Sequence, residues 1–105
     1  MDFYIDLGAE QLIAAMRDSD KIAVEIKTFL GASTISEFHT AIGQFINYRI
    51  ALEEEDAERL LYLAVPLDIY KRFFKYTFIQ TVIRRNQIPL LVYDTQKQEV
   101  AEWIS

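Results

Sequence analysis

The sequence predicts an α/β domain in which a mixed β-sheet is covered by helices. Three observations predict this fold class. Short apolar segments with strand-like composition occur near both ends, two long segments between them have helical spacing, and Gly and Pro are scarce, with three and two copies. Because helices placed between strands imply crossover connections, the sheet should contain parallel as well as antiparallel pairs.

The N-terminal third is expected to form a meander of strands. Residues 2–7 read as a first strand, which Gly8 ends, and residues 21–29 read as another, since β-branched and apolar residues alternate along them. Residues 11–16 are either a strand or a helical turn, because periodicity does not decide for so short an apolar run. The polar turn at residues 17–20 favours a hairpin with the following strand.

The rest of the chain is expected to alternate helices and strands. Apolar residues spaced three and four apart after Ser36 predict a packed helix, and Ser33, Thr34 or Ser36 is its expected cap. Pro66 ends the next apolar segment, and Arg84 and Arg85 suit the end of a helix. In chain order, these expected elements are a helix over residues 36–54, a strand over 60–65, a helix from 67 or 68 to 85, a strand over 88–93 and an edge strand over 99–104.

Composition limits the functional classes. A chain of 105 residues with 51% hydrophobic content predicts one domain, residues 1–105, with a substantial core. A net charge of −5 argues against broad wrapping of nucleic acid, and the absence of cysteine excludes disulfides and thiolate metal sites. No apolar run reaches the roughly 18 residues of a membrane span. The start Met1-Asp2-Phe3 has no basic region, so we expect a cytoplasmic protein without a signal peptide.

The strongest functional signal is the run Val24-Glu25-Ile26-Lys27. A strand has a period of two, so Glu25 and Lys27 should leave the same face of what looks like an interior strand. Burying charge is costly unless the charge is paired or bound to a metal. A structural ion pair at a sheet edge is the alternative interpretation, and about one acid-x-lysine triplet is expected by chance in a chain of this composition.

Asp6 offers a second carboxylate on another short apolar strand. Nineteen residues separate positions 6 and 25, which is enough for a strand pair and a turn to bring the two carboxylates to neighbouring positions. Mg²⁺ prefers carboxylate, water and phosphate oxygens, so Asp6 and Glu25 are candidate Mg²⁺ ligands, with Lys27 beside a bound phosphate. Taken alone, Asp6 also suits a strand end before a glycine turn.

The first helix adds two further candidates. Gln44 and Tyr48 are four residues apart and therefore lie on one helix face, where they offer an amide and a hydroxyl. The alternative is that Tyr48 is a core aromatic residue with its hydroxyl at the rim and that Gln44 lies at the boundary of the core. On the residues alone, both interpretations stay open.

The sequence resembles the XisH family of fdxN-element excision controlling factors, which is known from cyanobacteria. The resemblance covers nearly the whole chain, and the runs that carry it are residues 2–10, 12–15, 21–31, 41–45, 61–66 and 90–94. It implies a restriction-endonuclease-like fold of the PD-(D/E)XK nuclease superfamily. In that pattern Asp6 matches the isolated acid, Glu25 and Lys27 match the acid-x-lysine pair, and Gln44 and Tyr48 match a helix-borne Gln-x-x-x-Tyr motif.

The resemblance also implies a biological setting. The family's role is in programmed DNA excision during heterocyst differentiation, and the expected partners are DNA and a protein of the XisI family. The expected activity is that of a Mg²⁺-dependent DNA endonuclease-like domain, and the alternative is a non-catalytic module that binds XisI or a recombinase. Family members carry a leading helix before the position of Asp2, so we expect this chain to lack that helix and to self-associate through an uncovered sheet face. Met16 also departs from the family pattern, in which an acid is expected.

Overall fold

The computed structural model describes the backbone of residues 4–7 and 10–105, and the side chains from residue 12 onward. Its first described element is a strand. The elements are β1 (Tyr4–Leu7), β2 (Glu10–Arg17), β3 (Asp20–Ile26), α1 (Thr34–Glu55), β4 (Leu60–Pro66), α2 (Leu67–Arg72), α3 (Thr77–Arg85), β5 (Leu90–Asp94) and β6 (Glu99–Ile104).

The six strands form one mixed sheet in the order β1-β2-β3-β4-β5-β6. The pairs β1–β2, β2–β3 and β5–β6 are antiparallel, whereas β3–β4 and β4–β5 are parallel. This confirms the predicted mixed α/β sheet, and the segment that periodicity left undecided is strand β2 of a hairpin. The sheet flanked by helices agrees with the restriction-endonuclease-like arrangement that the resemblance implies.

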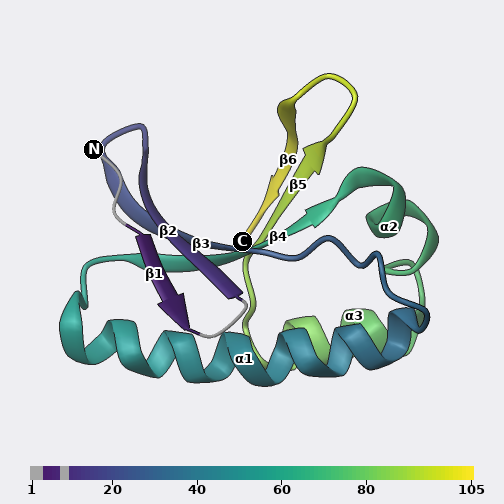
Figure 1. The fold of residues 1–105 in the computed structure, drawn as a ribbon, viewed down its shortest axis with the longest axis horizontal. Coiled ribbons are helices and arrows are strands. Elements are labelled where there is room, and N and C mark those ends of the chain that lie inside the picture. Colours follow the sequence, from purple (N-terminus) through teal and green to yellow (C-terminus); the bar gives the residue numbers. More distant parts are fainter. Residues whose placement is uncertain (1–3, 8–9) are drawn as a thin grey trace.

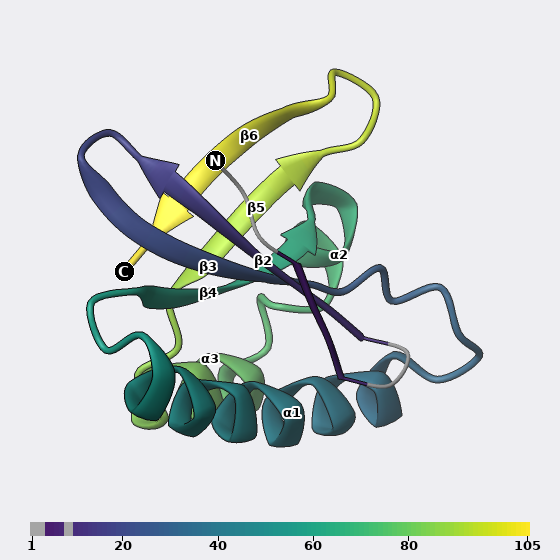
Figure 2. The same cartoon turned by 60° about the vertical axis from the view of Figure 1, so that its left-hand side comes forward.

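Helices α1 and α3 lie side by side along one side of the sheet, while the β5–β6 hairpin points away from them (Figures 1 and 2). Helix α1 begins after Ser33, whose side-chain oxygen accepts a hydrogen bond from the backbone N–H of Ser36. Its apolar stripe faces the sheet and is at most 5% exposed; the stripe consists of Phe38, Ala41, Phe45, Tyr48 and Leu52. Burial of this stripe therefore holds α1 against the sheet.

The predicted long second helix is wrong, because the structure divides it into α2 and α3. The backbone leaves the helical region at Tyr76, which is extended with φ −70° and ψ 137°. The ring of Phe73 lies 5.6 Å from that of Phe38, and the ring of Phe74 lies 5.8 Å from it. Because both aromatic residues pack on the first turns of α1, the chain turns between them and Thr77 instead of continuing as one straight helix.

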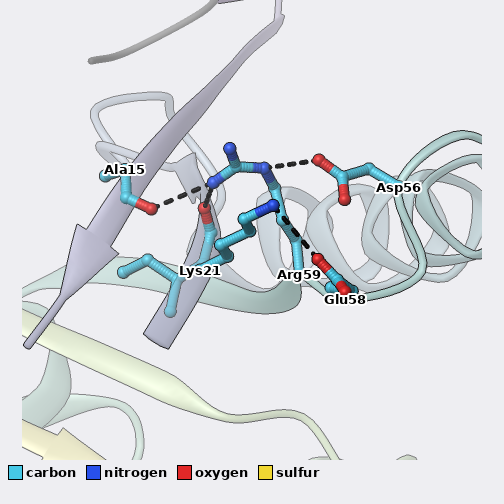
Figure 3. A network of polar contacts seen from close by, with 6 residues as sticks. Ala15, Lys21, Asp56, Glu58 and Arg59 are labelled. Atoms are coloured by element: carbon cyan, nitrogen blue, oxygen red, sulfur yellow. Dashed lines mark hydrogen bonds and ion pairs between the residues drawn. The ribbon is translucent and has the colours of Figure 1, made fainter. Parts of the chain in front are cut away.

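Arg59 ties the β2–β3 hairpin to the connection between α1 and β4 (Figure 3). Its guanidinium donates to the backbone carbonyls of Ala15 (3.0 Å) and Ile22 (2.9 Å) and pairs with the Asp56 carboxylate at 2.7 Å. A planar guanidinium suits several acceptors at once, so one side chain satisfies two carbonyls of the hairpin. This contact fixes the strand that carries Glu25 relative to the end of α1.

The sequence predicts that no segment is apolar and long enough to span a membrane. Within residues 4–7 and 10–105, every helix is too short or too polar to cross a bilayer.

Candidate functional site

Lys27 follows β3 and is fixed by the two neighbouring parallel strands. Its backbone N–H donates to the carbonyl of Ala64 in β4 (3.0 Å), and its own carbonyl accepts from the hydroxyl of Tyr93 in β5 (3.1 Å). Burial raises the pKa of Tyr93 above its ordinary value of 10.0, and the nearby Asp68 carboxylate adds to this effect. The hydroxyl is therefore protonated near neutral pH and remains a hydrogen-bond donor to Lys27.

The loop after Lys27 is held by a buried aromatic residue in an unusual backbone conformation. Phe29 has φ 56°, which is the left-handed region that bulky residues rarely adopt. It is only 6% exposed, and its ring packs edge-on against Phe74 at 6.1 Å. Such strain, of the order of 1 kcal/mol or more, persists only where the surroundings hold it. Packing of this ring therefore sets the path by which the chain leaves Lys27.

Glu25 is the one fully buried charged residue among the described side chains, with 0% exposure. It lies in register between Leu12 of β2 and Leu63 of β4, so its neighbours across the strands are apolar. The Lys27 Nζ atom lies 3.9 Å from Glu25 Oε2, and the Lys27 side chain is 12% exposed. The structure thus brings the acid and the amine of the acid-x-lysine pair together on one side of the sheet, within a site of low dielectric constant.

Gln44 completes this cluster from α1. Its Oε1 atom accepts a hydrogen bond from Lys27 Nζ, so the ammonium lies between Glu25 and Gln44. Tyr48, one helical turn after Gln44, is 5% exposed and belongs to the main hydrophobic core. We refer to Glu25, Lys27 and Gln44 as the Glu–Lys–Gln cluster. The contact between Lys27, directly after β3, and Gln44 of α1 links two residues that are 17 positions apart.

The carboxylate of Asp6 lies outside the described side chains, but its backbone register is defined. Asp6 pairs with Gln11, whereas Leu12 pairs with Glu25, so Asp6 and Glu25 occupy alternate register positions, which belong to opposite faces of a regular sheet. Glu10, the first residue of β2, lies two positions before Leu12 and so shares the register phase of Leu12 and of Glu25. Glu10 is therefore a second candidate for the acid of this site, which pattern matching on residue type and spacing overlooked.

The donor set suits a hard cation bound partly by solvent. The described residues contain no group of three His, Cys, Asp or Glu side chains that could hold a metal ion. Mg²⁺ commonly binds through one or two carboxylates and keeps several waters or phosphate oxygens as its other ligands. Among the described side chains Glu25 is the one fully buried carboxylate, so a metal ion held here would need solvent, substrate or further acids as its other ligands.

Comparison with known proteins assigns the chain to a family. The family model described as XisH protein matches residues 1–101. The chain belongs to the XisH family. No curated protein matches this XisH chain.

Two solved structures resemble this XisH chain along almost its whole length. The crystal structure of an XisH family protein from Nostoc punctiforme PCC 73102 shares 51% sequence identity, with a TM-score of 0.87, and the match covers 98% of this chain and 83% of that one. The crystal structure of a fdxN element excision controlling factor protein from Anabaena variabilis also shares 51% identity, with a TM-score of 0.86, and the match covers 98% of this chain and 82% of that one. The fold described above is therefore that of this family.

Proposed function

We propose that this XisH protein is a DNA-rearrangement accessory factor with a Mg²⁺-dependent endonuclease-like site at the Glu–Lys–Gln cluster. The relative from Anabaena variabilis is described as a fdxN element excision controlling factor, which supports the accessory role. The main support for an endonuclease-like site is that the fully buried Glu25 carboxylate lies 3.9 Å from the Lys27 ammonium, which donates a hydrogen bond to the amide oxygen of Gln44. Such a combination of buried charges is characteristic of functional sites.

In this proposal Glu25 and one acid of the β1–β2 hairpin, Asp6 or Glu10, hold Mg²⁺. When bound, the ion supplies Lewis-acid chemistry: it neutralises charge on a phosphodiester and makes water more acidic. Lys27 places its ammonium against the anionic oxygens of the phosphodiester, where the surrounding apolar residues strengthen the attraction. Gln44 positions that ammonium through its Oε1 atom. Tyr48 supports the same face of α1 from within the core.

The test is cleavage of supercoiled plasmid DNA by the purified protein in the presence of Mg²⁺. Lys27→Met should lower the cleavage rate by about 100-fold or more, as removal of a preorganised electrostatic group does. Lys21→Met is the matched control, because Lys21 lies on β3, which leads to Lys27, but is half exposed and pairs with Glu58. Equal cleavage by the wild type and Lys27→Met would refute the proposal. Asp6→Asn and Glu10→Gln, compared side by side, decide which acid acts with Glu25.

A second function, a non-catalytic module that binds an XisI-family protein or a recombinase, is favoured by the closure of the site. Glu25 is 0% exposed and the Lys27 side chain only 12%, so a phosphodiester has little access without rearrangement. If the protein is such a module, the Glu25–Lys27 pair contributes only to the stability of the fold. Co-purification with an XisI-family protein that survives Glu25→Gln, with no Mg²⁺-induced stabilisation of the wild type, is the result expected of such a module. Mg²⁺ binding without partner binding would contradict it.

A further inference from the structure

The charge of this acidic protein is unevenly distributed. Residues 69–93 contain five of the eleven basic residues and none of the sixteen acidic residues. This segment therefore carries a charge of +5, while the remaining 80 residues carry −10. The Asp68 carboxylate, which precedes the segment, pairs with Arg72 at 3.5 Å, and Lys71 lines a cavity together with Asp68 and Asp94, so part of this charge is balanced. The net positive charge of the segment favours an anionic ligand.

Within this basic region, residues 71–78 combine exposed cations with exposed aromatic rings. Lys71, Arg72 and Lys75 are exposed, and the rings of Tyr76 and Phe78 are 55% and 60% exposed. These residues lie where α2 ends and α3 begins. Large aromatic residues are normally buried, so two of them exposed within three positions require an explanation.

The Tyr76 ring is already part of an aromatic and cationic arrangement. It packs edge-on against the ring of Phe73 at 6.3 Å, and the Lys75 Nζ atom lies 5.6 Å from its centre. Phe73 in turn contacts Phe38 of α1, so this ring is supported from the core. A supported ring that is 55% exposed is suited to stacking, because little conformational entropy is lost when a ligand covers it.

The same segment is joined to the loop that carries Lys27. Phe74 contacts Phe29, which lies two residues after Lys27 and holds the strained loop conformation described above. Residues 71–78 are therefore linked through the core to the loop that follows Lys27. This connection is independent of any metal ion.

We propose that residues 71–78 bind single-stranded DNA, with Tyr76 and Phe78 stacking on unpaired bases and Lys71 and Lys75 contacting phosphates. Proteins that bind single strands combine stacking aromatic residues with basic residues along the backbone. The cores of protein interfaces, in contrast, are depleted in lysine, and the bases of a duplex are not available for stacking on a side chain. This inference rests on the proposed function and deepens it, because it names single-stranded DNA as the form of the substrate.

The test is fluorescence anisotropy of a labelled oligothymidine of about 12 nucleotides, a length within the usual range for one binding domain. EDTA is present, so that binding is measured without cleavage. Tyr76→Ala combined with Phe78→Ala should raise the Kd by about 30-fold or more, as expected for the loss of two stacked bases. Ile50→Ala combined with Leu60→Ala is the matched control, since these exposed apolar residues (51% and 48%) lie on other elements.

The phosphate contacts are tested through salt dependence. Lys71→Gln combined with Lys75→Gln should reduce the slope of log K against log salt by roughly 1.4, which is the value for two lost single-strand contacts. Arg84→Gln combined with Arg85→Gln removes equal charge from the same basic region and should leave the slope closer to that of the wild type. Circular dichroism shows whether each variant is folded.

Three results would overturn the proposal: no binding of the oligonucleotide, equal affinity for a duplex of the same length, or unchanged affinity of the ring variant. If the ring variant instead loses only self-association in sedimentation velocity, the surface is an interface between copies of this chain and the proposal also falls. If the wild type binds the oligonucleotide but does not cleave plasmid DNA in the presence of Mg²⁺, the proposed function alone is refuted and the binding proposal stands.

Discussion

The Glu25–Lys27 pair provides a prediction in which stability separates two interpretations of the site. Removal of one partner leaves the other charge buried, which typically costs about 3–5 kcal/mol, whereas replacing both partners by neutral groups is often close to neutral. Glu25 is 0% exposed and Lys27 only 12%, and their charged atoms are 3.9 Å apart. We therefore expect Lys27→Met to destabilise the protein by about 3 kcal/mol, the lower end of that range, because the separation is long.

The double variant Glu25→Gln/Lys27→Met should lie within about 1 kcal/mol of the wild type, since no charge is left buried. Because Lys27→Met alone costs about 3 kcal/mol, the coupling energy in the double-mutant cycle is at least about 2 kcal/mol, and any cost of Glu25→Gln alone adds to it. Urea unfolding followed by the fluorescence of Trp103, the single tryptophan, measures the four free energies of unfolding. Additive effects of the two substitutions would refute the reasoning that the two charges interact in the fold.

Repeating this cycle with Mg²⁺ distinguishes a metal site from a structural ion pair. An ion that binds only the folded state stabilises it by about 2.7 kcal/mol at 100 times its Kd. Mg²⁺ should raise the melting temperature of the wild type, raise that of Lys27→Met further because the ion replaces the lost positive charge, and leave Glu25→Gln unchanged. Coupling between Glu25 and Lys27 with no response to Mg²⁺ in any variant would identify the pair as structural.

Three further predictions concern the elements around the site. Arg59→Met should lower the free energy of unfolding in urea titrations by about 2–4 kcal/mol, because two backbone carbonyls lose a charged donor. Lys21→Ala, which breaks an exposed ion pair, should lower it by less than about 1 kcal/mol. Tyr93→Phe should make the stability of the protein fall less steeply as the pH becomes alkaline, as measured by melting curves. The folded-state pKa of Tyr93 is raised, so the stabilisation by Tyr93 is complete below pH 10.0 and is lost as the pH rises through its folded-state pKa. Ser33→Ala should cost about 1 kcal/mol through loss of the α1 cap, and equal thermal stability of this variant and the wild type would contradict the capping role.

Local patterns were sufficient for most of the fold. The β2–β3 hairpin, the mixed sheet and the edge strand β6 follow from alternation, turn residues and helix spacing, which act within a few residues. The break between α2 and α3 does not, because residues 67–85 have helical spacing throughout. It depends on the packing of Phe73 and Phe74 against α1, a tertiary contact that overrides local preference.

Local patterns predicted only part of the site. A period of two places Glu25 and Lys27 on one face, but their burial depends on α1 covering that face of the sheet. The contact between Lys27 and Gln44 bridges 17 positions, and no local pattern predicts it; the family resemblance implied only that Gln44 belongs to the site. The choice between Asp6 and Glu10 depends on strand register, in which a shift of one residue reverses the face of every side chain. Register of this kind is not encoded in residue type.

The most direct measurement of the metal site is anomalous diffraction from crystals of this protein soaked in Mn²⁺, which substitutes for Mg²⁺ at oxygen ligands. We predict one anomalous peak within coordination distance of a Glu25 carboxylate oxygen and of an acid from the β1–β2 hairpin. The peak should disappear in crystals of Glu25→Gln. A fully occupied Mn²⁺ elsewhere with none at Glu25, or a peak that survives Glu25→Gln, would contradict the assignment of this cluster as the metal site.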